Sequence, residues 1–421
     1  MSGTEEVSVL ELVLHGIRVG YLTGYKDGRN TLMFAPEFTG DSSRPTFTLT
    51  THPDFPNAKD LLAKPWSKRQ RLHPVLSNLL PEGALRELLA QHLKIHIDNE
   101  FGLLARLGQD LPGALIVTAA EPDDIPGYVL APRAKAIKAD MQSYAKHFSL
   151  AGVQMKFSMR KRDGRYRIAE SGDLGNWIIK TPSTRHKLVP LNEFTAMQLA
   201  KIAGIRIPDI RLVEMEVIDK LPAINLPDEK FAFAIRRFDR EGQKRVHAED
   251  FAQILARYSW QKYDGPNYEQ IGKIIYQYTG ENLKNAQQFA RRLLVNILLG
   301  NGDAHLKNWS LIYPDAVTPE LSPAYDIVAT HVYMDGEREY ALNLGRNKDW
   351  YKVTFGHFRA WADKAGIPWR AIKPQLDDTL DKARSLWPES LDDLPAHHTH
   401  KKQIKEHWRG LSADFRIKTA G

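Results

Sequence analysis

The first part of the chain alternates apolar and polar residues, the period expected of half-buried β-strands. The alternation is clearest in VSVLELVLHG, IRVGYLTGY and NTLMFAP, and KDGRN between the last two segments predicts a hairpin turn. A helical pattern then starts at Pro81 (PEGALRELLAQHL), with the proline in the first turn, and a strand-like GALIVTA comes later. These elements predict a separate N-terminal subdomain over residues 1–120.

The pattern changes twice further along the chain. Residues 121–146 lose the alternation and carry three prolines, so we expect a linker there. Residues 147–240 read as strands around one helix, LNEFTAMQLAKIAG, whereas helical patterns dominate residues 241–421. Within this second range, NWSLIY and SPAYDIV are expected to be short extended segments. The predicted fold class is α+β: a bilobal, protein-kinase-like fold with an N-terminal β-rich subdomain, a strand-rich region over 147–240 and a mostly helical C-terminal lobe over 241–421.

Composition narrows the class of protein. The chain of 421 residues is 43% hydrophobic and 26% charged, which is typical of globular proteins. Its first residues, MSGTEEVSVLELVL, are acidic where an export signal would be basic, and cysteine is absent, so we expect a cytoplasmic protein without disulfides or Cys-ligated zinc. The net charge of +7 permits an anionic partner such as nucleotide or nucleic acid, but such a charge often means only solubility.

One polar turn between an apolar helix and an apolar strand carries candidate chemistry. In GNGDAHLKNWSLIY, Asp303 and Asn308 stand five residues apart, and Asp326 follows eighteen residues later. Phosphoryl transfer needs one carboxylate to accept the hydroxyl proton, and an amide with a second carboxylate to hold Mg²⁺. The spacing satisfies that scheme, with His305 and Lys307 as donors on the phosphate side, although no His-Arg-Asp precedes the loop and no Phe-Gly follows Asp326.

Upstream residues could complete such a site. Lys180 ends the apolar strand NWIIK, where its ammonium could reach phosphates, and Glu193 opens the next helix as a candidate ion-pair partner. The small-residue turn SLAGVQMKF before them ends in Lys156 and could lay backbone N–H groups over phosphates. The strand FAFAIRRFD is a candidate hinge whose backbone would meet adenine.

These motifs together resemble the HipA family, the serine/threonine-kinase toxins of bacterial type II toxin–antitoxin modules. The resemblance spans roughly residues 75 to 330 and includes NLLPEGALRELLA and FGLLARLGQDLPGAL in the N-terminal region. It is carried in order by SLAGVQMK, NWIIKTP, NEFTAMQLAKIAGI, RRFDR, GNGDAHLKNWSLIY and LSPAYDIV.

The resemblance implies a role for each matching residue. Asp303 matches the catalytic aspartate, Asn308 and Asp326 match the ligands of Mg²⁺, and Ser149 matches a serine that family members autophosphorylate to switch the kinase off. At the hinge a relative has Glu-Arg-Phe-Asp, whereas this chain has an arginine at position 236. Adenine recognition at the hinge is largely by backbone, so the resemblance still implies nucleotide binding there. The positions that match nucleotide contacts are Ala151, Gly152, Val153, Gln154, Met155, Lys156, Lys180, Arg236, Arg237, Phe238, His305, Leu306, Lys307, Asn308, Tyr325 and Asp326.

Similarity to the family also implies cofactors and partners. ATP and Mg²⁺ are the implied cofactors, and a translation component, an aminoacyl-tRNA synthetase, is the implied substrate. The implied partner is a HipB-like helix-turn-helix antitoxin dimer, which would bring operator DNA to the toxin.

Other interpretations of the same residues stay open. Asp303 could be a turn residue, Glu193 could favour its helix N-terminus electrostatically, and Ser149 could be an ordinary strand-end serine. Histidines near position 400 do not share one helical face and predict a solvated helix start, and the basic runs at 64–71 and 401–409 could be exposed faces or DNA contacts. A catalytically weak co-repressor and a small-molecule kinase are the alternative functions.

Overall fold

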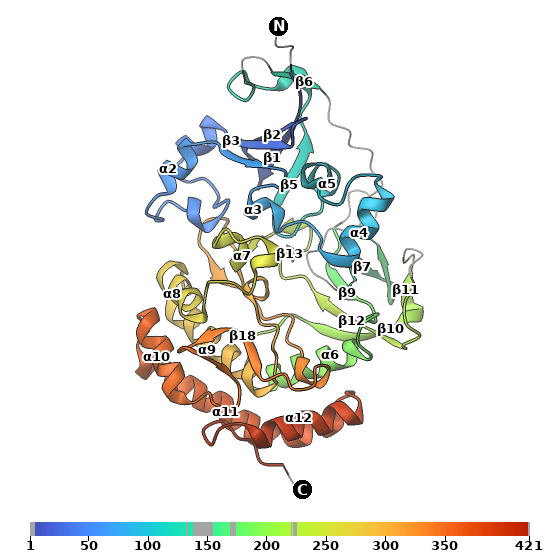
Figure 1. Cartoon of the computed structure of the whole chain (residues 1–421), viewed down its shortest axis with the longest axis vertical. Helices are drawn as coiled ribbons and strands as arrows, with labels where there is room; N and C mark the ends of the chain where they lie inside the picture. Colours follow the sequence, from blue (N-terminus) through green and yellow to red (C-terminus); the bar gives the residue numbers. More distant parts are fainter. Residues whose placement is uncertain are drawn as a thin grey trace. The chain divides into compact units, whose positions relative to one another are not determined.

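The computed structural model describes residues 5–131, 134–137, 155–168, 174–219, 221 and 225–419. The chain forms two compact units (Figure 1). Unit 1 contains residues 1–178, 239–259 and 312–318, and unit 2 contains residues 179–238, 260–311 and 319–421.

Unit 1 is built on an antiparallel sheet with strand order β4-β3-β2-β1-β5, to which β6 adds as a parallel neighbour of β1. A hairpin of β7 and β8 also belongs to this unit. Its strands are β1 (Glu5–Leu14), β2 (Ile17–Tyr25), β3 (Arg29–Phe34), β4 (Trp66–Arg69), β5 (Leu115–Ala119), β6 (Ala134–Ile137), β7 (Lys156–Arg162), β8 (Arg165–Ile168), β13 (Arg240–Glu241), β14 (Lys244–Arg245) and β15 (His247–Asp250). Its helices are α1 (Pro36–Gly40), α2 (Ala58–Ala63), α3 (Pro74–Ser77), α4 (Gly83–His92), α5 (Glu100–Leu107) and α7 (Phe251–Ile254).

The alternation read from the sequence explains the core of unit 1. Leu10, Leu12 and Leu14 of β1 lie in the large core cluster, whereas Val7 and Val9 belong to a smaller second cluster. Successive side chains of a strand point to opposite faces, so β1 contributes to two apolar layers. The predicted hairpin at KDGRN is confirmed, because β2 pairs with β3 in antiparallel register.

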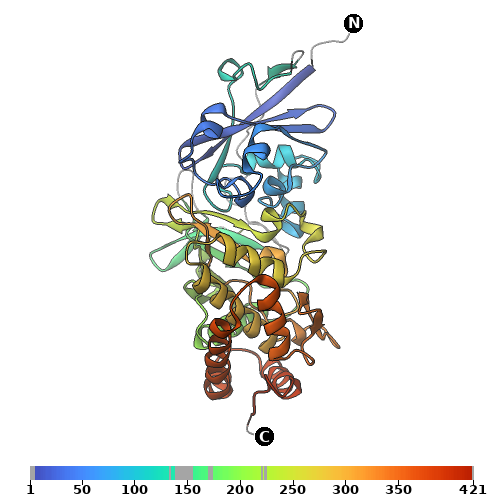
Figure 2. The same cartoon turned by 90° about the vertical axis from the view of Figure 1, so that its left-hand side faces the viewer.

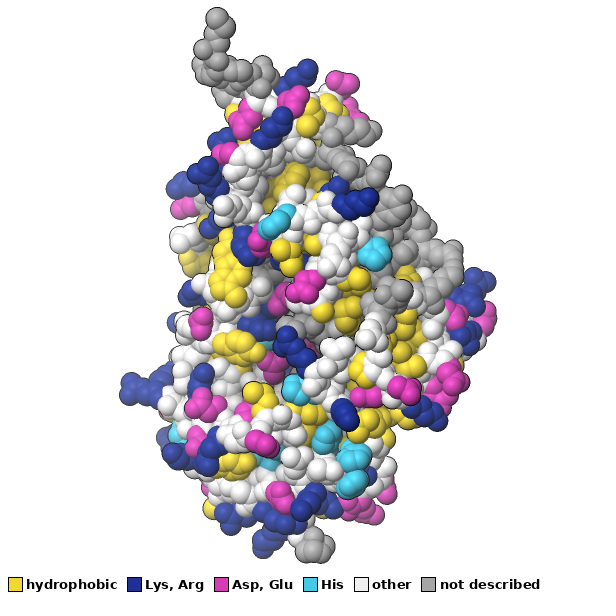
Figure 3. Space-filling view, turned by 45° about the vertical axis from the view of Figure 1, so that its right-hand side comes forward, with side chains coloured by type: hydrophobic (Ala, Val, Ile, Leu, Met, Phe, Trp, Pro, Cys, Tyr) yellow, Lys and Arg dark blue, Asp and Glu magenta, His cyan; other side chains and the backbone are white. Residues whose placement is uncertain are grey.

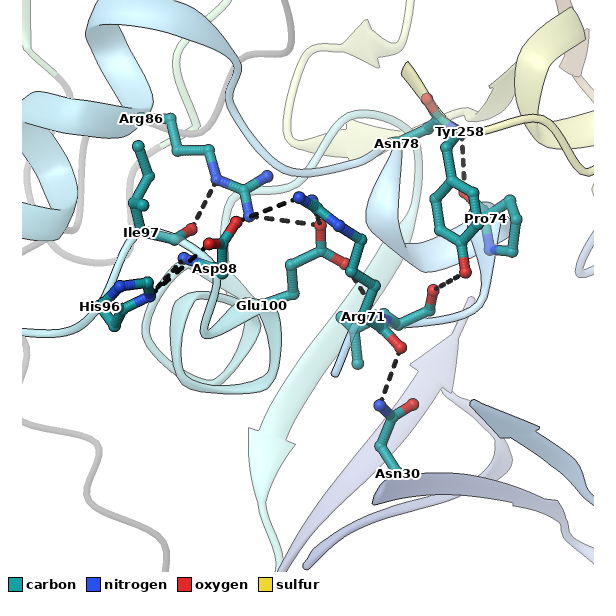
Figure 4. A network of polar contacts seen from close by, with 11 residues as sticks. Asn30, Arg71, Pro74, Asn78, Arg86, His96, Ile97, Asp98, Glu100 and Tyr258 are labelled. Carbon is teal, nitrogen blue, oxygen red and sulfur yellow. Dashed lines mark hydrogen bonds and ion pairs between the residues drawn. The ribbon is translucent and has the colours of Figure 1, made fainter. Parts of the chain in front are cut away.

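A buried ion cluster fastens α5 to the chain around β4 and α4 (Figure 4). Glu100, which is fully buried, accepts hydrogen bonds from Arg71 Nη1 at 3.0 Å, Arg86 Nη2 at 3.2 Å and the Leu72 N–H at 2.9 Å. Arg71 also donates to Asp98 at 3.1 Å. Because a buried carboxylate is stable only when paired and hydrogen-bonded, the two arginines are structural partners of Glu100.

A second buried carboxyl in unit 1 has neutral hydrogen-bond partners. Glu249 of β15 accepts from the Thr48 hydroxyl at 2.6 Å, from the Leu49 N–H at 2.7 Å and from the Tyr313 hydroxyl. Burial raises the pKa of Glu249 to about 7, although the hydrogen bonds from Thr48 and Tyr313 act in the opposite direction.

Unit 2 is mainly helical. Its long helices pack in layers: α11 lies against α9 and α6, and α10 lies against α8 (Figure 1 and Figure 2). Its helices are α6 (Val189–Ile202), α8 (Tyr268–Tyr278), α9 (Asn282–Leu298), α10 (Phe355–Ala365), α11 (Trp369–Asp393) and α12 (His398–Gly410). Its strands are β10 (Ile210–Glu214), β11 (Ile218–Asp219), β12 (Phe231–Arg236), β17 (Glu320–Leu321), β18 (Glu339–Leu344) and β19 (Asn347–Asp349). The chain passes between the units within β9 (Trp177–Lys180) and β16 (Ser310–Tyr313).

Three local expectations differ from the structure. Helix α4 begins at Gly83, so Pro81 precedes the helix instead of lying in its first turn. Strand β6 lies within the range 121–146, which we expected to be a linker, and the segment SPAYDIV, expected to be extended, forms no strand. Asp326 in this segment has a φ of 54°, a left-handed conformation that aspartate tolerates better than most residues and that does not fit a strand.

Candidate active site

The candidate catalytic loop begins where α9 ends, and two glycines make its path possible. Gly300 has a φ of 61°, and a Cβ atom there would lie 2.4 Å from His331 Nδ1. A Cβ atom at Gly302 would lie 2.2 Å from Glu337 Oε1. Both distances are below van der Waals contact. At Gly300 the positive φ and the His331 ring exclude a side chain, whereas at Gly302 the end of the Glu337 side chain would have to move. Asp303 follows directly after this turn.

The backbone around Asp303 is held by two asparagines. The Asp303 N–H donates to Asn301 Oδ1 at 3.1 Å, and Asn308 Nδ2 donates to the Asp303 carbonyl at 2.7 Å. The second bond explains the five-residue spacing, because it closes the loop on itself. Since the Asn308 nitrogen is used in this bond, its side-chain oxygen is the atom that can act as a metal ligand.

Asn301 also connects this loop to Asp326. Its Nδ2 donates to Asn296 Oδ1 at 2.7 Å and to the Asp326 carbonyl at 3.4 Å. One buried amide therefore joins the backbone of Asp303 and the backbone of Asp326, and α9 supplies the anchor through Asn296.

Lys180, Glu193 and Asp326 form an ion triad. Lys180 at the end of β9 lies 2.5 Å from Glu193 Oε1 of α6 and also donates to Asp326 Oδ1. The side chains of Lys180 and Glu193 are 7% and 1% exposed, whereas that of Asp326 is 26% exposed. Burial alone would lower the pKa of Lys180, but the carboxylates of Asp326 and Glu193 outweigh it and raise this pKa, so the ammonium stays charged.

A cavity brings together two of the predicted metal ligands. Asn308 and Asp326 both line it, as does Tyr325, whose hydroxyl donates to the Lys307 carbonyl at 2.9 Å. The full lining is Arg292, Asn296, Asn301, Ala304, Asn308, Trp309, Ala324, Tyr325, Asp326 and Ile327.

The donor set of this cavity fits a hard cation. Amide and carboxylate oxygens are the ligands that Mg²⁺ takes from proteins, and Mg²⁺ completes its shell with waters and phosphate oxygens. Within the described ranges of the chain, no cluster of three or more His, Cys, Asp or Glu side chains has the geometry of a metal site. The histidines around position 400 accordingly form no such site there.

The remaining predicted contacts of unit 2 lie in different environments. His305, Leu306 and Lys307 are buried. Phe238 lies beside Tyr325, with 5.5 Å between ring centroids. Arg237 is buried. Arg236 is exposed, and its Nη1 lies 3.5 Å from Oδ2 of Asp209, which is also exposed.

The predicted phosphate loop is described only in part. Met155 and Lys156 lie in unit 1, where Lys156 is the first residue of β7. Ser149, Ala151, Gly152, Val153 and Gln154 lie outside the described residues.

Sequence reasoning missed several residues around the loop. Tyr263 donates its hydroxyl hydrogen bond to Asp303 Oδ1 from forty residues upstream. Arg292 is buried at the cavity, and burial together with nearby Arg206 lowers its pKa to about 9, so it remains cationic at neutral pH. Neither residue has a spacing signal, because both contacts depend on the tertiary fold; only Asn301, adjacent to the loop, could have been found from the sequence.

Comparison with known proteins gives two family matches. A family described as HipA N-terminal domain matches residues 10–118, and one described as HipA-like C-terminal domain matches residues 148–387. A Sinorhizobium fredii protein named "Putative kinase Y4dM" is 38% identical over 393 residues, which are 93% of this chain and 94% of that protein. The "Serine/threonine-protein kinase toxin HipA" of Shewanella oneidensis is 25% identical over 331 residues, 70% of this chain and 71% of the relative.

A solved structure shares the fold. HipA in the Shewanella oneidensis complex of HipA, HipB and operator DNA superimposes with a TM-score of 0.70 at 22% identity, covering 96% of this chain and 97% of that chain. This likeness confirms the α+β, kinase-like fold class predicted from the sequence. In the part of the chain that the structure describes, no helix has the length and apolar character needed to span a membrane.

Proposed function

Since this chain belongs to the HipA family, we propose that it is a serine/threonine protein kinase toxin that transfers a phosphoryl group from ATP to a hydroxyl. The observation that carries the proposal is the ion triad of Lys180, Glu193 and Asp326 beside a loop that holds Asp303 and Asn308. Phosphoryl transfer depends on positioning and charge stabilisation, and these residues are the groups that it requires.

Each residue has a distinct part in this proposal. Lys180 is a fixed positive charge for phosphate oxygens, and Glu193 orients it from α6. Asn308 and Asp326 would hold Mg²⁺, which supplies charge neutralisation for the phosphates when it is bound. Asp303 accepts the proton of the acceptor hydroxyl while the hydroxyl oxygen bonds to the γ-phosphorus of ATP and the bond from that phosphorus to the β–γ bridging oxygen breaks, so that ADP leaves. The Asp303 side chain, 52% exposed, is open to an incoming protein substrate.

We further propose that Ser149 is phosphorylated by the chain itself and that the residues 151–156 bind the nucleotide phosphates, with the hinge at 236–238 against adenine. A phosphate on Ser149 would add a charge of about −1.5 to −2 near the phosphates of ATP, and this repulsion opposes nucleotide binding. The support for this assignment is the sequence resemblance, since Ser149 lies outside the described residues.

Target and partners are proposed from the relatives. We propose a cytoplasmic toxin whose substrate is a translation component, an aminoacyl-tRNA synthetase, and whose activity is held by a helix-turn-helix antitoxin dimer on operator DNA. The Shewanella structure, which contains HipA with HipB and operator DNA, supports this assembly. Comparing phosphopeptides in cells that express the wild type and Asp303→Asn would identify the target, and gel-shift assays with the neighbouring operator would test the assembly.

The central experiment incubates the purified chain alone with ATP and Mg²⁺ and follows phosphate incorporation by intact mass and peptide mapping. The wild type should label itself at Ser149, and Asp303→Asn should not. Asp363→Asn changes an exposed aspartate on α10 and serves as the matched control. Labelling by Asp303→Asn at the wild-type rate would show that Asp303 is not the base. No incorporation of phosphate into the wild-type chain would favour a small-molecule kinase.

A further inference from the structure

Tyr263 reaches the candidate base from a segment that no kinase motif includes. This segment follows a short 3₁₀ turn at Ser259–Gln261 and is tied to the catalytic loop, because the Leu306 N–H donates to the Lys262 carbonyl at 3.2 Å. Tyr263 is 42% exposed, so its ring borders solvent beside the candidate base.

Three contacts fix the ring of Tyr263. Its hydroxyl donates to Asp303 Oδ1. The ring meets the His305 ring edge to face, with 5.1 Å between centroids, and Lys262 Nζ lies 5.4 Å from the centre of the tyrosine ring. The Lys262 carbonyl is hydrogen-bonded to the catalytic loop at Leu306. This bond fixes the position of the neighbouring Tyr263 relative to Asp303 in the same loop.

His305 makes no hydrogen bond to Asp303 Oδ1 comparable to that of Tyr263. Its Nε2 lies 3.8 Å from Asp303 Oδ1, beyond hydrogen-bond distance. Burial, assisted by Lys262, keeps the pKa of His305 well below its usual range, so the ring is neutral and adds no positive charge beside Asp303. The Tyr263 hydroxyl therefore donates directly to Asp303 Oδ1, whereas the His305 ring packs against the tyrosine ring.

We propose that Tyr263 is a positioning residue for the phosphoryl-transfer base: its hydrogen bond to Oδ1 fixes the orientation of the Asp303 carboxylate toward the acceptor hydroxyl. The inference rests on the proposed kinase function and adds a residue to that site. Proton-transfer rates depend on the orientation of the accepting carboxylate, and the hydrogen bond from Tyr263 restricts that orientation.

The test is Tyr263→Phe, which keeps the ring and removes only the hydroxyl. We expect kcat for phosphorylation to fall about 10- to 100-fold, the effect of losing a hydrogen bond to a charged group, while the KM for ATP changes less than about twofold. Tyr128→Phe, at a tyrosine of similar exposure (40%) in unit 1, is the matched control and should leave both kcat and the KM for ATP unchanged.

A second measurement does not depend on turnover. The melting temperature of Tyr263→Phe should match that of the wild type, because only a hydroxyl is removed from a ring that is 42% exposed. A purely structural role would instead lower the melting temperature and leave kcat per folded molecule unchanged, and that result overturns the inference. If the wild type transfers phosphate and Asp303→Asn does not, but Tyr263→Phe has the kcat of the wild type, the kinase assignment stands and the role of Tyr263 is refuted. If the wild type transfers no phosphate, both proposals fail.

Discussion

The buried carboxyl of Glu249 gives the stability of unit 1 a dependence on pH that can be calculated. Glu249 is 2% exposed, and its partners Thr48, Leu49 and Tyr313 are uncharged donors. Its pKa rises from 4.5 to about 7 on folding, mainly because burial disfavours the carboxylate. The protonated form is therefore favoured in the folded state, and the perturbation that tests this is Glu249→Gln, a neutral side chain of the same size.

The magnitude follows from proton linkage. A folded-state pKa of about 7 against 4.5 spans about 2.5 pH units, which at about 1.4 kcal/mol per unit gives about 3 kcal/mol. The folded state binds more protons than the unfolded state in this interval. The stabilisation is therefore complete below about pH 4.5, declines as the pH rises, and is lost above about pH 7.

The assay compares free energies of unfolding in urea between pH 4.5 and 8, with amide hydrogen exchange at Leu49 as the local probe of unit 1. Relative to the wild type, Glu249→Gln should gain stability as the pH rises, by up to about 3 kcal/mol across the interval. Glu87→Gln, at an exposed position of α4, should show no such trend. A difference between wild type and Glu249→Gln that does not change with pH would refute the reasoning.

Three further predictions concern ion pairs and the loop. Lys180→Met should abolish ATP-dependent phosphorylation and destabilise the protein by about 3–5 kcal/mol, because it removes the cation paired with the buried Glu193 carboxylate. Adding Glu193→Gln should restore stability in urea titrations but should not restore phosphorylation. Glu100→Leu should lower the free energy of unfolding by about 3–5 kcal/mol, since Arg86 then lacks a carboxylate while only 11% of its side chain is exposed; an unchanged urea midpoint would contradict this. Gly302→Ala should reduce kcat more than ATP affinity, because its Cβ would displace the Glu337 carboxylate, which holds the Thr330 hydroxyl that accepts from the Gly302 N–H. Gly127→Ala, with no atom within 4 Å, should match the wild type in both.

The sequence predicted the elements whose cause is local. Alternation along β1 and the turn before β3 follow from neighbouring residues, and the structure confirms both. The Asp303–Asn308 spacing is local too, and a hydrogen bond of 2.7 Å now gives it a physical reason. Periodicity indicates which face is buried, and it does so wherever one strand or helix meets a core.

Contacts between distant segments leave no periodic pattern in the sequence. Tyr263 meets Asp303 across forty residues, and Lys180 meets Asp326 across 146, so tertiary packing alone brings them together. The left-handed backbone of Asp326 was missed for a similar reason: the apolar residues around it suggest a strand, and the actual conformation depends on Asn301 and Lys180 holding it. The roles assigned to the site residues stay predictions until the variants are measured.

The amide of Asn301 has a mechanical consequence. It accepts from the Asp303 N–H and donates toward the Asp326 carbonyl, so the two backbones are linked through a single planar group. An aspartate there would lack the donor and a leucine would lack both atoms, so the linkage tolerates few replacements. A shift of either segment would strain the hydrogen bonds of Asn301 to the other, so the positions of the Asp303 and Asp326 backbones are coupled.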